Sequence, residues 1–225
     1  MSLYIDSAYI PEIRVVADTV PMAGITTNPT ILLAAQDRGQ TLSSLQLLKE
    51  LLREFAGSIF MQPGEVDFEK MLQQATSFLE IDKARVIAKI PMTTAGMQVA
   101  RRLKQDKYRV AFTAVTSVAQ AYSAAMCEAD FIIPYFNRLE RSGIVATERI
   151  AEMAELFHTQ QLPTRILAAS IKSPQEAVAA LTAGAHDITA VPQVLLDMVT
   201  DPLTEEAIEK FSRDWQTLTK RQHKA

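Results

Sequence analysis

Residues 85–92 read Arg85-Val86-Ile87-Ala88-Lys89-Ile90-Pro91-Met92, an apolar and β-branched run that contains Lys89 and is closed by Pro91. Such a run is typical of a buried strand. Lysine is the residue least welcome there, because burial disfavours its charged ammonium. A neutral amine is a nucleophile for carbonyl carbon, so Lys89 indicates Schiff-base chemistry. The alternative is a lysine on an edge strand whose amine reaches solvent.

Similar strand-like runs alternate with helical patterns on both sides of this segment. The predicted strands are Leu3–Asp6, Gly24–Thr27, Ser58–Gln62, Val86–Ile90, Val110–Ala114, Phe131–Tyr135, Ile166–Ser170 and Asp187–Val191. Between them, apolar residues recur at helical spacing, for example across residues 45–52 and 150–157. Helix start signals stand before several of these patterns, at Asp67, Thr93 and Ser173.

Strands that alternate with helices along a whole chain predict a parallel sheet. Because the 225 residues contain no linker or break in composition, the simplest expectation is a single (β/α)8 TIM barrel over residues 1–225. A doubly wound open sheet is the alternative. One further amphipathic helix is expected over residues 203–222, with Phe211 and Trp215 on its apolar side. That side needs a partner surface, either on its own barrel or on a neighbouring subunit.

Composition excludes several classes of protein. The chain is 48% hydrophobic and 22% charged, with a net charge of −3, so it lacks the basic excess of a nucleic-acid-binding protein. It shows neither a signal peptide nor an apolar run of about 18 residues, so we expect a cytoplasmic protein without a membrane span. A single cysteine, Cys127, suits a reducing compartment and fits core packing better than a nucleophilic role. The three histidines are His158, His186 and His223. Their spacing in the sequence is not that of metal ligands.

Polar side chains gather at the carboxyl ends of the predicted strands, where (β/α)8 barrels place their active sites. They are Asp6, Thr26, Thr27, Asn28, Gln62, Lys89, Thr113, Tyr135, Arg138, Ser170 and Lys172. Taken singly, each could be a helix cap, a turn residue, an ordinary strand residue or a solvated charge. Together they supply an amine, a carboxylate, amides, hydroxyls and fixed cations. That equipment suits an imine-forming enzyme that acts on a polyhydroxy phosphate.

Six segments around these residues carry a family resemblance. They are Leu3-Tyr-Ile-Asp6-Ser, Ala23-Gly-Ile-Thr-Thr-Asn28-Pro-Thr, Ala88-Lys89-Ile-Pro-Met-Thr, Phe112-Thr113-Ala-Val, Ile133-Pro-Tyr135-Phe-Asn-Arg138 and Leu167-Ala-Ala-Ser170-Ile-Lys172-Ser-Pro. In this order they closely resemble the small-subunit transaldolase and fructose-6-phosphate aldolase family of class I aldolases. The resemblance implies a (β/α)8 barrel free of metal and organic cofactor. It also implies a homo-oligomer, commonly a decamer of pentameric rings, in which the C-terminal helix reaches a neighbour.

The resemblance further implies roles for the residues at the strand ends. Lys89 resembles the Schiff-base lysine. The hydroxyls of a dihydroxyacetone unit and the carbinolamine would be held by Asp6 and Asn28, with Thr26 also among the substrate-binding residues. Catalytic water would be held by Gln62, Thr113 and Tyr135. The phosphate end would be formed by Arg138, Ser170 and Lys172.

Two activities of this family remain open. Aldolase members tend to carry the tyrosine and glutamine seen at Tyr135 and Gln62, whereas transaldolase members tend to carry phenylalanine and an acid. The resemblance therefore favours a lyase that cleaves fructose 6-phosphate into dihydroxyacetone and glyceraldehyde 3-phosphate. The alternative is a transaldolase of the pentose phosphate pathway. Two departures from the family pattern bear on acceptor specificity: a shorter loop after Arg138, and Pro63-Gly64 after Gln62.

Two further classes of barrel also compete with an aldolase. A non-catalytic barrel that binds a sugar phosphate is disfavoured by the presence of both Lys89 and Asp6. A decarboxylase or isomerase would need a Lys/Asp or Glu/His constellation in place of one lysine with asparagine and tyrosine.

Overall fold

Eight parallel strands form the centre of the computed structural model, which describes residues 1–222. They are β1 (Ser2–Asp6), β2 (Gly24–Thr26), β3 (Ser58–Met61), β4 (Val86–Pro91), β5 (Val110–Val115), β6 (Phe131–Pro134), β7 (Arg165–Ile171) and β8 (Asp187–Ala190). Each strand pairs with the next in sequence, and β8 pairs with β1, so the barrel is closed. The predicted (β/α)8 barrel is confirmed, and the open-sheet alternative is wrong. His223 lies outside the described residues.

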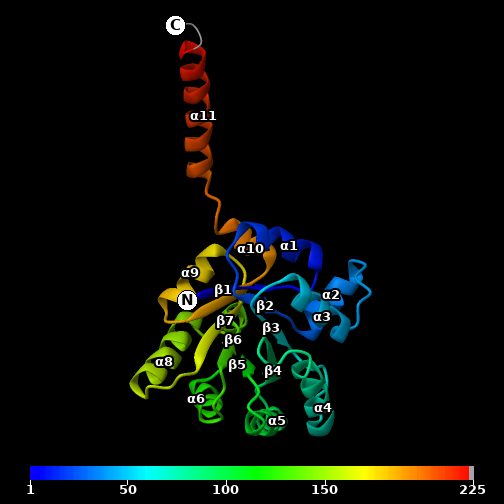
Figure 1. The fold of residues 1–225 in the computed structure, drawn as a ribbon. Helices are drawn as coiled ribbons and strands as arrows, with labels where there is room; N and C mark the ends of the chain where they lie inside the picture. Colours follow the sequence, from blue (N-terminus) through cyan, green and yellow to red (C-terminus); the bar gives the residue numbers. More distant parts are fainter. Residues whose placement is uncertain (223–225) are drawn as a thin grey trace.

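Helices surround the barrel, except for the last one, which stands away from it (Figure 1). They are α1 (Ile10–Thr19), α2 (Pro29–Asp37), α3 (Ser44–Glu54), α4 (Phe68–Leu79), α5 (Thr94–Gln105), α6 (Val118–Met126), α7 (Phe136–Arg141), α8 (Ala146–Thr159), α9 (Pro174–Thr182), α10 (Pro192–Asp197) and α11 (Pro202–Gln222). The predicted start signals are confirmed, because Asp67, Thr93 and Ser173 each accept a hydrogen bond from the first turn of the following helix. The ends of several strands differ from the prediction by one residue. Thr27, Gln62 and Tyr135 were predicted to end β2, β3 and β6, but each lies just after its strand.

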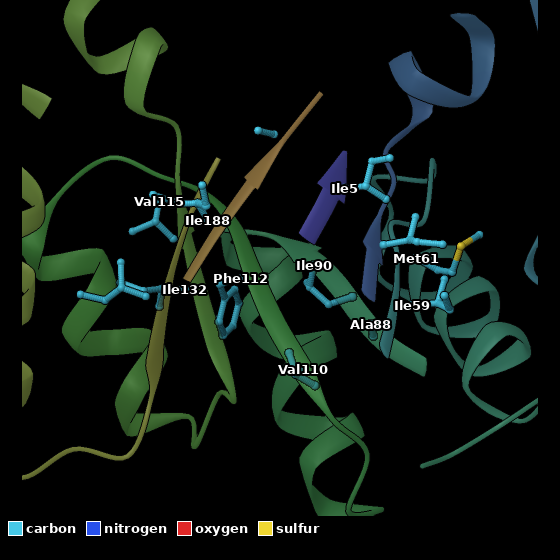
Figure 2. Close-up of a cluster of buried hydrophobic side chains, with 14 of the residues drawn as sticks. Ile5, Ile59, Met61, Ala88, Ile90, Val110, Phe112, Val115, Ile132 and Ile188 are labelled. Carbon is cyan, nitrogen blue, oxygen red and sulfur yellow. The ribbon is translucent and has the colours of Figure 1, made fainter. Parts of the chain in front are cut away.

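Two apolar layers fill the fold. The layer between strands and helices contains Ile5, Ala88, Ile90 and Phe112 (Figure 2). The layer inside the barrel contains Tyr4, Phe60, Ile87, Ala111, Phe131, Ile133, Leu167 and Ala169. Because side chains alternate between the two faces of a strand, this division shows which strand positions face the barrel interior.

An ion pair joins β7 and β8 at the amino-terminal end of the barrel. The carboxylate of Asp187, fully buried at the start of β8, accepts two hydrogen bonds of 2.8 Å from Arg165 at the start of β7. Burial, with a further contribution from Asp187, raises the pKa of the Tyr4 phenol nearby. Further along the interior, the rings of Tyr4, Phe60 and Phe131 meet edge to face with centroids 5.2–6.4 Å apart.

The C-terminal helix α11 stands away from the barrel (Figure 1). It has the predicted extent, but none of its residues is buried, and Trp215 is 67% exposed. Its apolar side therefore does not pack on the barrel of its own chain. No helix within residues 1–222, α11 included, is long and apolar enough to cross a membrane.

Candidate active site

Five of the predicted site residues continue the apolar layer inside the barrel. Each of these five stands two positions beyond a member of that layer, and therefore on the same face of the sheet as that member. The pairs are Tyr4 and Asp6, Phe60 and Gln62, Ile87 and Lys89, Ala111 and Thr113, and Ile133 and Tyr135. This spacing sets polar groups from five strands above an apolar floor, at the carboxyl end of the barrel. The expected gathering of polar side chains at this mouth is thus present in the fold.

Lys89 lies inside the barrel rather than at an edge. It is only 1% exposed, and β4 pairs with β3 on one side and β5 on the other. Its Nζ donates a hydrogen bond of 3.1 Å to the backbone carbonyl oxygen of Thr27. The alternative of an edge-strand lysine that reaches solvent is therefore wrong. A buried amine with unused bonding capacity is suited to covalent chemistry with a carbonyl compound.

Asp6 is held by Thr26, which is in turn hydrogen-bonded to Thr189. Thr26 Oγ1 donates to Asp6 Oδ1 over 2.7 Å, and it also lies 2.7 Å from Thr189 Oγ1. The end of β2 therefore contacts both the Asp6 carboxylate and the Lys89 amine. The Thr26 side chain holds Asp6, and the Thr27 carbonyl holds Lys89. Thr189, on β8, was not among the predicted residues. Its signal in the sequence is weak, since one β-branched residue in a strand is ordinary.

Three other predicted residues lie at the carboxyl ends of strands β3, β5 and β6. Thr113 Oγ1 and the Tyr135 hydroxyl are 2.8 Å apart and share a hydrogen bond. Arg138 covers the Tyr135 ring, with its guanidinium carbon 4.7 Å from the ring centroid. Gln62 Oε1 is buried and has no hydrogen-bond partner among the described residues. A buried acceptor needs a donor, so Gln62 is suited to bind a ligand or a water molecule.

Strained backbone occurs at two strand ends of this mouth. Ala114 and Ser170 both have φ of 60°, a left-handed conformation that non-glycine residues rarely adopt. The strand register shifts at both places, between Thr113 and Val115 and between Ala168 and Ile171. Such bulges redirect side chains and concentrate near functional sites, where the strain costs about 1–3 kcal/mol per residue. The sequence alone did not indicate them.

The predicted phosphate end is less closely assembled. Arg138 on α7 and Lys172 after β7 are both exposed, and no hydrogen bond joins either of them to the other or to Ser170 within residues 1–222. Glu176 connects their segments, because its carboxylate accepts hydrogen bonds from Asn137 Nδ2 at 3.1 Å and from the Lys172 backbone N–H at 2.8 Å. These cations lie at the carboxyl ends of neighbouring strands, as expected. The order of the strands places them there, and no direct hydrogen bond links them within residues 1–222.

Asn28 and Cys127 have structural roles. Asn28 caps α2, because its Oδ1 accepts a hydrogen bond of 3.0 Å from the Ile31 backbone N–H. This leaves the Asn28 amide hydrogens for a ligand.

Cys127 follows α6, away from the barrel mouth, and burial raises the pKa of its thiol. A raised pKa leaves less thiolate, which agrees with packing rather than nucleophilic attack.

Comparison with known proteins supports the family resemblance of the six sequence segments. The model of the transaldolase/fructose-6-phosphate aldolase family matches residues 3–223. A "Probable transaldolase" of Desulforudis audaxviator is 35% identical, over 98% of this chain and 100% of its own. Another, of Symbiobacterium thermophilum, is 34% identical over 96% and 97%. A "Probable fructose-6-phosphate aldolase" of Streptococcus pneumoniae is 33% identical over 96% of both chains.

A closed (β/α)8 barrel with polar groups at its carboxyl mouth defines the architecture of a barrel enzyme. Within that class, the chain belongs to the transaldolase/fructose-6-phosphate aldolase family. The family predicted from the six segments is confirmed.

Proposed function

We propose that this chain is a Schiff-base aldolase that cleaves fructose 6-phosphate to dihydroxyacetone and glyceraldehyde 3-phosphate, and also forms it from them. The observation that carries the proposal is Lys89, a 1% exposed amine inside the barrel, at the end where the polar groups of the neighbouring strands gather. In water-poor surroundings a lysine amine is suited to attack a ketone. The reaction as proposed uses no metal and no organic cofactor.

The first half of the proposed cycle forms an imine. Lys89 Nζ attacks the C2 ketone of the sugar phosphate and gives a carbinolamine. Water held by Gln62, Thr113 and Tyr135 takes and returns protons while the carbinolamine loses water. Asp6 and Asn28 hold the hydroxyls of the three-carbon end, and Arg138, Ser170 and Lys172 bind the phosphate at the other end. The product is a protonated imine on Lys89.

The second half of the cycle breaks the carbon chain. The protonated imine accepts the electron pair of the C3–C4 bond while a base removes the proton of the C4 hydroxyl. Glyceraldehyde 3-phosphate leaves, and Lys89 retains a three-carbon enamine. Protonation of the enamine carbon and hydrolysis of the imine release dihydroxyacetone and restore the amine. The Tyr135 hydroxyl, 2.8 Å from Thr113 Oγ1, is our candidate for ordering the water and relaying that proton.

Transaldol transfer is the second candidate function. In that reaction a second aldehyde captures the enamine before a proton does, and the same lysine serves both outcomes. The names of several relatives, "Probable transaldolase", favour this alternative. Tyr135 and Gln62 favour cleavage, through the family resemblance described above.

The proposal extends to the assembly of the protein. No residue of α11 is buried within residues 1–222, and Phe211 is 61% exposed. Apolar side chains on one face of a long helix need a partner surface. We therefore include a homo-oligomer, in which α11 packs on a neighbouring subunit, in the proposed function.

Reductive trapping tests the imine. The protein is incubated with fructose 6-phosphate or dihydroxyacetone and borohydride, and the adduct is located by peptide mass spectrometry. We expect a three-carbon adduct on Lys89 and no adduct in Lys89→Met. An adduct on Lys172, or full activity in Lys89→Met, would contradict the proposal.

A further inference from the structure

Thr189 is a fully buried hydroxyl that none of the family segments contains. It lies on β8, opposite Tyr4 of β1 in the strand register, while Thr26 of β2 lies opposite Asp6. Strands β8 and β2 flank β1, so the two threonine side chains meet inside the barrel next to Asp6. Distances of 2.7 Å from Thr189 Oγ1 to Thr26 Oγ1 and 2.7 Å from Thr26 Oγ1 to Asp6 Oδ1 make one continuous chain.

The donors and acceptors of these two hydrogen bonds follow from the number of hydrogens that each group carries. Each threonine hydroxyl has one hydrogen, and an ionised carboxylate only accepts. Thr26 therefore donates to Asp6 Oδ1, and Thr189 must donate to Thr26. Within residues 1–222 the Thr189 hydroxyl has no other acceptor, and no solvent reaches it. In this direction the hydroxyl hydrogens of both threonines have an acceptor.

Packing alone does not explain a threonine at this position. Its neighbour in the register is Tyr4, a member of the apolar layer inside the barrel. Valine has nearly the same shape and no polar atom to bury, so it would suit an apolar surrounding better. A buried hydroxyl is tolerated here because it is hydrogen-bonded, and its bond leads toward Asp6.

We propose that Thr189 is a positioning residue for Asp6. Its bond holds the Thr26 hydroxyl toward Oδ1 and strengthens the next bond, because hydrogen bonds in a chain polarise one another. Asp6 Oδ1 is thereby fixed, while Oδ2, which has no partner within residues 1–222, faces the substrate hydroxyls. This inference rests on the proposed function, in which Asp6 holds the three-carbon end of the substrate.

Kinetics of imine formation test the proposal. Thr189→Val removes the donor, Thr189→Ser keeps it, and Thr164→Val is the matched control. Thr164 is also a buried threonine, bonded to the Ala129 carbonyl at 2.8 Å, but it precedes β7 at the opposite end of the barrel. We measure the rate of the borohydride-trapped adduct with saturating dihydroxyacetone. Thr189→Val is expected to be about fivefold slower, the equivalent of one hydrogen bond, with Thr189→Ser and Thr164→Val close to the wild-type rate.

A crystal structure of Thr189→Val gives a second measurement that does not depend on activity. We expect the Thr26 side chain to rotate or its distance to Asp6 Oδ1 to lengthen. Thr189→Val at the wild-type rate, with the Thr26–Asp6 bond unchanged, would overturn the proposal. Thr189→Ser as slow as Thr189→Val, or Thr164→Val equally slow, would also overturn it, because shape or general loosening would then be the cause. A wild-type protein that forms no adduct would refute the proposed function instead, and the crystal structure would still decide the role of Thr189.

Discussion

Replacing Tyr135 with phenylalanine removes one oxygen from the barrel mouth and leaves the ring in place. The lost phenol is the hydrogen-bond partner of Thr113, at 2.8 Å, and the ring retains its contact with the Arg138 guanidinium. Because the ring stays and only one hydrogen bond is lost, the fold should be nearly unaffected. The substitution therefore isolates the chemical role of the hydroxyl.

The size of the effect distinguishes two roles. If the phenol only orders water, its loss removes about 1 kcal/mol, or roughly fivefold in rate. If it relays the proton that reaches the enamine, its loss should slow the release of dihydroxyacetone by about 10²–10⁴-fold. We expect the larger effect on release, with imine formation at Lys89 spared, because the enamine then waits for an acceptor aldehyde.

Two assays check this expectation. The first follows glyceraldehyde 3-phosphate formed from fructose 6-phosphate without an added acceptor, and the second repeats the reaction with erythrose 4-phosphate. Tyr122→Phe is the matched control, because Tyr122 lies on α6 and is 44% exposed. If the wild-type protein turns over only with erythrose 4-phosphate and Tyr135→Phe changes nothing, the reasoning is refuted and the chain is a transaldolase.

Three further predictions follow from other parts of the molecule. Arg138→Ala should weaken kcat/KM for phosphorylated aldehydes by about 2–3 kcal/mol and barely affect unphosphorylated ones, whereas equal losses would make Arg138 structural. Deleting residues after Leu203 should lower the mass measured by light scattering, and a monomeric full-length protein would contradict this. Burial lowers the pKa of His186, whose Nδ1 must stay unprotonated to accept the Ile166 backbone N–H at 3.0 Å. Its contribution to stability is therefore complete above the unfolded pKa of about 6.5 and falls as the pH drops below it. Urea unfolding at pH 7.5 and 5.5 should show a smaller loss in His186→Asn, which keeps an acceptor that does not titrate.

The sequence predicted the fold well because one physical pattern repeats along it. Strands buried on both faces read as apolar, β-branched runs, and helices begin at capping residues such as Asp67 and Ser173. It also predicted where Lys89 lies, because a single cation in an apolar strand has few explanations. Alternation then places Thr113 and Tyr135 on the same interior face.

The remaining features depend on contacts between distant segments. Thr189 looks ordinary in sequence, and only closure of β8 on β1 brings it to Thr26, 163 positions away. The left-handed backbone at Ala114 and Ser170 has no local signal, since neither residue is glycine. The position of α11 depends on packing as well, because an amphipathic pattern specifies an apolar face but not its partner.

The edge-to-face aromatic rings of Tyr4, Phe60 and Phe131 separate the two polar ends of the barrel interior. The Arg165–Asp187 pair lies at the amino-terminal end, and Lys89 with its neighbours lies at the carboxyl end. Substitutions that share no partner tend to have additive effects. The two ends can therefore change independently during evolution, because a substitution at either end alters no hydrogen-bond partner of the other.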